Sequence, residues 1–216
     1  MGLNCGCPVA ASLQGLKIPE CKESLGQIQK VLFQRIFKSE ATKNRISLED
    51  IKKKTSMAAL LSAKDSSKLI VSPYIQNPTT TPGEARTFGG GNQTLGGIEI
   101  IIGREPTSFE GVIYQESQSV IKTLKSYSCE TIGVYLIDEH GNIAGFSPED
   151  TTDILPIPID KFFVGDKNLG GYEEPDSNTI SWNFQANWSD NLVIVKYSFG
   201  DGNFDYYPLL DLANAN

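Results

Sequence analysis

Side chains that could carry out chemistry are few and scattered in this 216-residue chain. The only histidine, His140, lies two residues after Asp138 in the sequence D-E-H-G-N. A histidine oriented by a carboxylate can act as a general base, so this pair is one candidate catalytic site. A lone histidine beside a glycine is more often an ordinary polar turn residue. No nucleophile elbow, HExxH or P-loop sequence accompanies it, and we expect no catalytic residues and no enzymatic activity.

Two other groups could bind a metal. Three of the four cysteines, Cys5, Cys7 and Cys21, lie near the N-terminus. A zinc site would need a fourth ligand, and no residue has suitable spacing for it. Free thiols in a reducing compartment are therefore favoured. Residues 201–205 (D-G-N-F-D) resemble the start of a calcium loop. The glycine is misplaced, and Leu212 occupies the position where that loop has its final glutamate. We therefore predict no metal site and no cofactor.

Charge is unevenly distributed along the chain. Residues 1–70 carry 12 basic and 6 acidic side chains, a net of +6, and residues 71–216 carry 7 basic and 20 acidic ones, a net of −13. Such an asymmetry can attract copies of the chain to one another, or both regions can simply be solvated surface. The acidic majority argues against sequence-specific nucleic-acid binding, because it repels phosphate.

The elements that must position any site are organised around residues 96–146. A β-branched run at 98–102 (I-E-I-I-I) predicts a strand, and the pattern after Pro106 predicts a long amphipathic helix. Thr107 and Glu110 have capping-box spacing, and the apolar positions follow at Phe109, Val112, Ile113, Val120, Ile121 and Leu124. Strands at 132–138 and 143–146 then form a predicted hairpin. A helix of this kind must pack on a sheet to cover its apolar face.

The remaining chain predicts an N-terminal arm, a second helix and several more strands. Residues 1–24 are expected to be the arm, and 27–37 fits both strand and helix spacing, with strand favoured. We predict a helix at 47–63 with Ser47 as its cap, strands at 69–75 and 159–164, and a hairpin of 179–188 with 192–199. The predicted fold class is α+β: an antiparallel β-sandwich or barrel-like sheet with one long packed helix, in a single domain at 25–216.

Residues 77–97 are rich in glycine, threonine and proline. The triple glycine at 89–91 lacks the Lys-Ser/Thr that a phosphate-binding loop needs, so nucleotide binding is disfavoured. A long loop in a compact domain is usually functional or disordered. We interpret it as a projecting loop or β-hairpin that becomes ordered against another subunit. The candidate interface residues are Thr79, Thr80, Thr81, Phe88, Gly89, Gly90 and Gly91.

Strands covered by one long helix, with a projecting Gly/Thr/Pro loop, resemble the tail-tube fold of tailed bacteriophages. The sequence at 21–36 (C-K-E-S-L-G-Q-I-Q-K-V-L-F-Q-R-I) is similar to openings of tail structural proteins from phages of Bacteroides-type hosts, crAss-like phages included. This resemblance implies a virion protein, made in the host cytoplasm, that forms a homo-oligomeric ring in the tail or head–tail connector. It also implies that DNA passes through the lumen of the ring and that the neighbouring proteins are tail or portal-proximal proteins. It further implies that no membrane is involved and that the projecting loop clasps the next subunit. The extra arm and basic helix favour a specialised ring or adaptor.

A second hypothesis is a carbohydrate- or receptor-binding β-domain. Its aromatic platform would consist of Trp182, Trp188, Tyr206 and Tyr207, which must then be exposed and clustered. The alternation from Ile180 to Ala186 instead predicts that Trp182 is buried.

Overall fold

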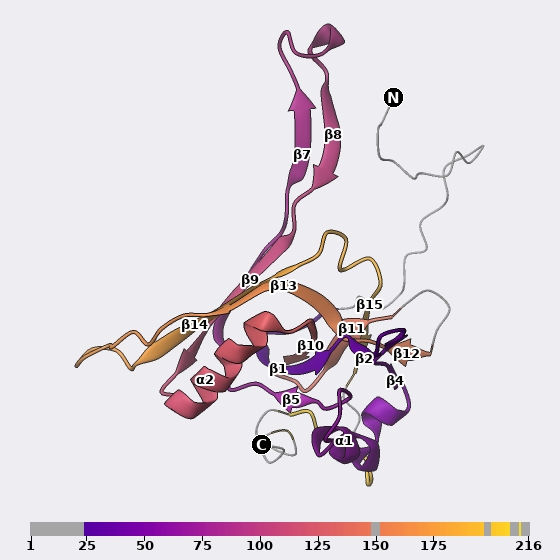
Figure 1. Cartoon of the computed structure of the whole chain (residues 1–216), viewed down its shortest axis with the longest axis vertical. Helices are drawn as coiled ribbons and strands as arrows, with labels where there is room; N and C mark the ends of the chain where they lie inside the picture. The colour runs from indigo at the N-terminus through magenta and orange to yellow at the C-terminus, as the bar shows by residue number, and fades with distance from the viewer. Residues whose placement is uncertain (1–23, 148–151, 197–199, 208–211, 213–216) are drawn as a thin grey trace.

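The computed structural model describes residues 24–147, 152–196, 200–207 and 212, so the predicted arm and its three cysteines lie almost wholly outside the described residues. The main sheet has nine strands in the order β15-β11-β10-β13-β14-β9-β6, with β1 on β10 and β5 on β1 (Figure 1). In chain order these strands are β1 (Ile28–Arg35), β5 (Ile70–Val71), β6 (Gln76–Thr81), β9 (Thr107–Tyr114), β10 (Ile132–Asp138), β11 (Ile143–Phe146), β13 (Ile157–Val164), β14 (Ser177–Phe184) and β15 (Leu192–Val195).

Hydrogen bonds from the segment between β5 and β6 bring the β6 end of the main sheet back to β1. β1 pairs antiparallel with β10, and from there the pairs run through β13, β14 and β9 to β6. Between β5 and β6 the chain returns to β1, where the backbone N–H groups of Ser72 and Ile75 donate to the carbonyls of Val31 and Gln29 at 2.9 and 2.8 Å. The strands therefore surround an apolar interior.

Every residue of β10 is buried. Two hydrophobic clusters lie on opposite faces of this strand. Val134 and Leu136 face the interior, which also contains Trp182 stacked on Phe109 with ring centroids 4.1 Å apart. Tyr135 alternates to the other face and joins a second cluster under the first helix. β10 is thus the central strand of the fold, because both of its faces are covered.

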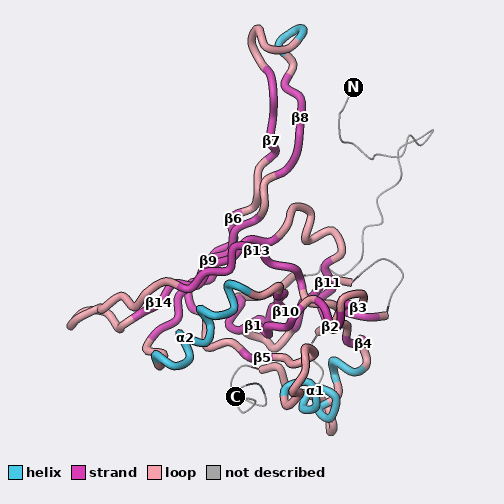
Figure 2. The backbone as a smooth tube through the Cα atoms, viewed as in Figure 1, coloured by secondary structure: helices cyan, strands magenta, loops and turns pink. Residues whose placement is uncertain are grey.

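Short elements complete the fold (Figure 2). The helices are α1 (Lys54–Leu61) and α2 (Gln118–Ser126), with 3-10 turns η1 (Asp50–Lys52), η2 (Leu95–Gly97) and η3 (Tyr127–Cys129). Two small sheets pair β2 (Phe37–Ser39) with β3 (Thr42–Lys43) and β4 (Ile46–Ser47) with β12 (Asp153–Ile154). Among the described helices, none has the length and apolar character required to span a membrane.

The α+β class is confirmed, but the single long helix is wrong. Residues 107–114 form strand β9, and helix α2 begins only at Gln118, where the Ser117 hydroxyl accepts a hydrogen bond from the N–H of Val120. Phe109 and Ile113 are four residues apart, a spacing that fits both one helix face and one strand face. Pairing of this segment with β14 and β6 selects the strand, in which Gly111 lies against Ile75 with no room for a side chain. The two-sheet sandwich remains a prediction.

Other expectations divide similarly. Strands are confirmed at 27–37, 98–102, 132–138, 143–146 and 159–164. The helix expected at 47–63 is confined to η1 and α1, although the Ser47 hydroxyl does accept a hydrogen bond from the N–H of Asp50 at 3.0 Å. The predicted hairpin of 179–188 with 192–199 is wrong, because β14 pairs with β13 and β9 while β15 pairs with β11.

Candidate functional site

A β-hairpin projects from the body of the protein at the place where sequence predicts a projecting segment. Its outer part consists of β7 (Ala85–Gly89) and β8 (Glu99–Arg104), and η2 lies at its tip (Figure 1). The hairpin continues outward from the paired strands β6 and β9 of the main sheet. The base of the projection is therefore anchored in the main sheet, whereas β7 and β8 pair only with each other.

The projecting hairpin exposes large apolar side chains. The exposed fraction is 55% for Phe88, 99% for Leu95, 67% for Ile98, 61% for Ile101 and 48% for Ile102. Their exposure is unusual because a soluble surface normally presents such residues singly.

Apolar side chains occupy both faces of this hairpin. Phe88 lies opposite Ile100 across the strand pair, and the adjoining pair of Thr87 with Ile101 points to the other face. A two-stranded hairpin on its own is at best marginally stable in water. Partner surfaces on both faces would stabilise this one.

Glycine and threonine shape the tip of the hairpin. Gly89 has φ +111°, and a side chain there would lie 2.5 Å from the Thr94 methyl group. The Thr94 hydroxyl accepts a hydrogen bond from the N–H of Gly90 at 3.3 Å and donates to the carbonyl of Ile98 at 2.6 Å. The triple glycine thus serves a tight chain reversal.

The predicted interface residues separate into two places along the projection. Thr79, Thr80 and Thr81 lie in β6 at the base and are exposed, whereas Phe88 and the three glycines lie near the tip. The candidate interface residues predicted from the sequence do not include the exposed apolar residues of the tip and of β8. The run I-E-I-I-I predicts a strand, but its flanking glycines and short length also fit an outlying hairpin.

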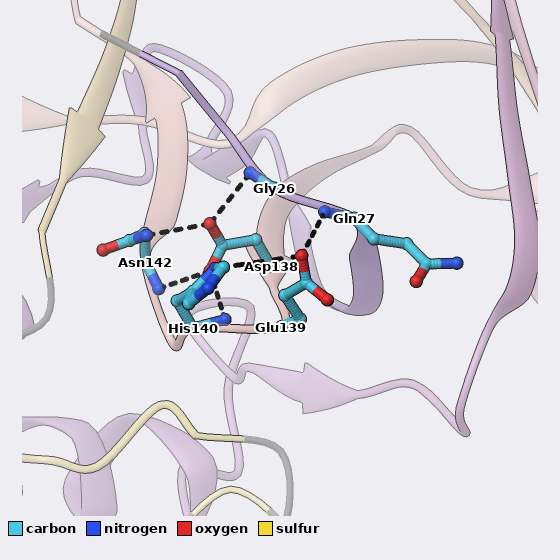
Figure 3. A network of polar contacts seen from close by, with 6 residues as sticks. All are labelled: Gly26, Gln27, Asp138, Glu139, His140 and Asn142. Carbon is cyan, nitrogen blue, oxygen red and sulfur yellow. Dashed lines mark hydrogen bonds and ion pairs between the residues drawn. The ribbon is translucent and has the colours of Figure 1, made fainter.

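The Asp138–His140 pair is a structural turn (Figure 3). The fully buried carboxylate of Asp138 accepts hydrogen bonds from the backbone N–H groups of Gly26, His140 and Asn142 at 3.0, 2.9 and 2.8 Å. It also accepts one from the Asn142 side-chain amide at 2.8 Å. The contact with His140 is made by the backbone, and the imidazole is 69% exposed, with Nδ1 3.9 Å from Glu139 Oε1. The carboxylate therefore ties the start of β1 to the turn between β10 and β11.

The other candidate sites are not assembled. Among the described residues, no group of three or more His, Cys, Asp and Glu side chains could hold a metal. In the calcium-like sequence, Asp205 Oδ1 accepts a hydrogen bond from the N–H of Tyr207 at 2.8 Å. The predicted burial of Trp182 is confirmed, and Tyr206 is buried as well, so the four aromatics do not form one exposed platform. Trp188 stacks on Phe184 with ring centroids 4.3 Å apart.

No protein-family model and no curated protein matches the chain. Two solved structures show weak similarity. One is the tail of an empty GTA particle, solved by helical refinement with C6 symmetry; it is 11% identical, with a TM-score of 0.34, over 64% of this chain and 90% of that chain. The other is the baseplate of the anti-feeding prophage (AFP), a cryo-EM structure with sixfold symmetry imposed; it is also 11% identical at a TM-score of 0.34, over 82% of this chain and 99% of that chain. Scores this low do not establish a common fold.

Proposed function

We propose that this protein is a structural subunit of a tailed-phage virion and assembles with copies of itself into a ring in the tail or head–tail connector. The observation that carries this proposal is the projecting hairpin, whose apolar side chains lie in solvent on both faces. In an assembly the hairpin would insert between neighbouring subunits, and the protein would act by burying surface. We accordingly propose that it has no enzymatic activity.

The hairpin contributes to contact with a partner and not to the core of its own chain. Among the buried hydrophobic residues, none lies between Ile75 and Phe109. Burying one large apolar side chain stabilises a contact by about 1.5–3 kcal/mol, so five of them offer roughly 7–15 kcal/mol. Association itself costs an estimated ~4–15 kcal/mol. A single hairpin contact would thus be weak, and a closed ring with several such contacts would be stable.

The charge distribution fits passage of DNA through such a ring. Residues 71–216 carry a net charge of −13, and a negative surface repels the phosphate backbone. In the proposed ring the acidic side chains line or flank the lumen, and DNA passes without adhering and without sequence-specific contacts.

The test compares the full-length protein with a hairpin variant carrying Phe88→Ser, Ile98→Ser and Ile101→Thr. Analytical ultracentrifugation over a range of concentrations, followed by negative-stain imaging, measures assembly. We expect the wild type to form rings with a central hole and the variant to form no such rings. Urea unfolding should leave the midpoint of the variant unchanged, because these side chains lie outside the core.

A matched control is Phe163→Ser, which removes an exposed aromatic (60% exposed) from β13 instead of the hairpin. It should assemble as the wild type does. Rings formed equally well by the hairpin variant would refute the role of the hairpin. A wild type that remains monomeric at every concentration would contradict the ring itself.

A further inference from the structure

A second projection, residues 165–176, connects β13 to β14 and extends away from the body (Figure 1). We call it the acidic loop. Its base is fixed by reciprocal backbone hydrogen bonds between Asn168 and Ser177, at 2.7 and 3.0 Å. Two further contacts hold it: the carbonyl of Asp176 accepts a hydrogen bond from the N–H of Gln115 at 2.9 Å, and Asp166 forms an ion pair with a lysine of α2. The two ends of the loop are thus tied to the body by contacts within the same chain.

The apex of the acidic loop has no covering within the described part of the chain. Leu169 is 76% exposed, and the Tyr172 side chain is fully exposed. Glu173 and Glu174 follow directly and are exposed as well, and no described residue forms an ion pair with either. A loop with an anchored base and an exposed tyrosine at its apex is suited to docking on a partner. Tyrosine provides a large contact area at low cost in conformational entropy.

A cavity of complementary character lies in the body. It has a volume of about 430 Å³ and is lined by the end of β1, the segment before β5 and the residues after α2. Its apolar walls are Phe33, Ile70, Tyr127 and Ile132. The lining also contains Arg35 and Glu130, which form an ion pair with each other, and Asp65, whose carboxylate accepts hydrogen bonds from Ser67. Lys64 and Lys68 also line it, are exposed, and form no ion pair with any described residue.

We propose that the acidic loop of one copy docks into this cavity of a neighbouring copy, with Tyr172 and Leu169 against its apolar walls and Glu173 and Glu174 facing Lys64 and Lys68. We infer that the partner is a second copy of this chain, because the exposed apolar and acidic apex complements the apolar walls and the two exposed lysines, which outnumber Asp65 once Arg35 and Glu130 have paired with each other. The loop cannot reach the cavity of its own chain, since its base is tied to β14 and its apex points away from the body (Figure 1).

This inference rests on the proposed self-assembly but uses a different part of the surface from the hairpin. The contact is heterologous, since loop and cavity are different patches, and contacts of this kind generate rings or filaments. The lysines and glutamates would mainly set the orientation and the rate of encounter, and the buried tyrosine would supply most of the affinity.

The experiment uses charge reversal in the full chain, with sedimentation as the readout. Lys64→Glu with Lys68→Glu places like charges opposite the acidic loop, and we expect self-association to weaken about tenfold or more. Adding Glu173→Lys with Glu174→Lys restores opposite charges and should recover most of the lost association. Leu169→Ala with Tyr172→Ala should weaken association by at least the same factor, without recovery by charge reversal.

The matched control is Lys52→Glu with Lys196→Glu, which makes the same change in net charge at exposed lysines outside this cavity. It should associate as the wild type does. Weakening in the control equal to that in the cavity variant, or no recovery in the fourfold charge-reversed variant, would overturn the docking proposal. If the hairpin variant alone abolishes assembly and the loop variants assemble normally, loop docking is wrong and the proposed function stands. A wild type that never associates overturns both.

Discussion

Replacing Asp138 by asparagine separates a structural role of this carboxylate from a catalytic one. The side chain is fully buried, and each of its oxygens accepts two hydrogen bonds: Oδ1 from the N–H groups of His140 and Asn142, and Oδ2 from the N–H of Gly26 and the Asn142 amide (Figure 3). An asparagine has the same shape but only one oxygen. Whichever way its amide is turned, two donors face an NH₂ group that cannot accept from them.

The expected loss follows from these contacts. A hydrogen bond to a charged group contributes about 1.5–3 kcal/mol, and a buried donor left without an acceptor costs about 1–3 kcal/mol. Losing two of the four bonds, with partial relaxation of the turn, should lower the free energy of unfolding by roughly 2–4 kcal/mol. Because Gly26 precedes β1, the start of that strand should also become more exposed to hydrogen exchange.

Urea unfolding followed by circular dichroism measures the change, and hydrogen exchange at 26–30 and 138–143 locates it. Glu139→Gln is the matched control in the same turn, since Glu139 accepts only a 3.5 Å hydrogen bond from the N–H of Gln27. The control should change the free energy of unfolding by less than about 0.5 kcal/mol. A loss below about 1 kcal/mol for Asp138→Asn would refute the reasoning that this network anchors β1.

Two further predictions concern the core. Gly111→Ala should destabilise the fold by about 1–3 kcal/mol in urea unfolding, because the added methyl would lie 2.4 Å from a methyl of Ile75. A neutral effect would contradict the packing of β9 against Ile75, the residue that precedes β6. Burial raises the pKa of the Tyr135 and Tyr206 hydroxyls, so above about pH 10 only the unfolded chain ionises them. The free energy of unfolding should therefore fall as pH rises above about 10, and it should fall less steeply in the double variant Tyr135→Phe/Tyr206→Phe. An equal pH dependence in the wild type and the variant would contradict the raised pKa of these tyrosines.

Sequence reasoning succeeded where one period was unambiguous. The alternation of Ile180, Trp182 and Phe184 predicts a strand with one buried face, and β14 has that burial pattern. Ala186, which continues the same alternation, lies beyond the strand and is exposed. Local patterning therefore identified the element and its inner face but not its end, because the end is set by pairing with β13 and β9.

Sequence reasoning failed where a segment fits two periods. Phe109 and Ile113 suit a helix and a strand equally, and Thr107 with Glu110 has capping-box spacing by coincidence. The strand is selected by pairing on both sides, with Thr80 and Trp182 each in register with Phe109. Such contacts are distant in sequence, and no local pattern contains them.

The candidate interface shows the same limit in another form. An isoleucine-rich run predicts a strand, and β8 is indeed one, yet Ile101 and Ile102 are exposed because the hairpin extends beyond the main sheet. Burial of that run is missing from the single chain, and we infer that the assembly provides it. A partner is indicated by two observations together: the run is strongly apolar in sequence, and its side chains are exposed in the single chain. Neither observation alone would indicate a partner.

Two independent contacts are what a stack of rings requires, one between neighbours within a ring and one between successive rings. The protein has two apolar-tipped projections, the hairpin and the acidic loop, which leave the body from different strands (Figure 1). The basic excess of residues 1–70 and the acidic excess of 71–216 favour contacts between unlike parts of two copies over contacts between like parts. Both proposed contacts are heterologous, and an assembly held by only one of them would be either an isolated ring or an open chain of subunits. Loss of one projection should therefore change the shape of the particles, and loss of both should leave monomers.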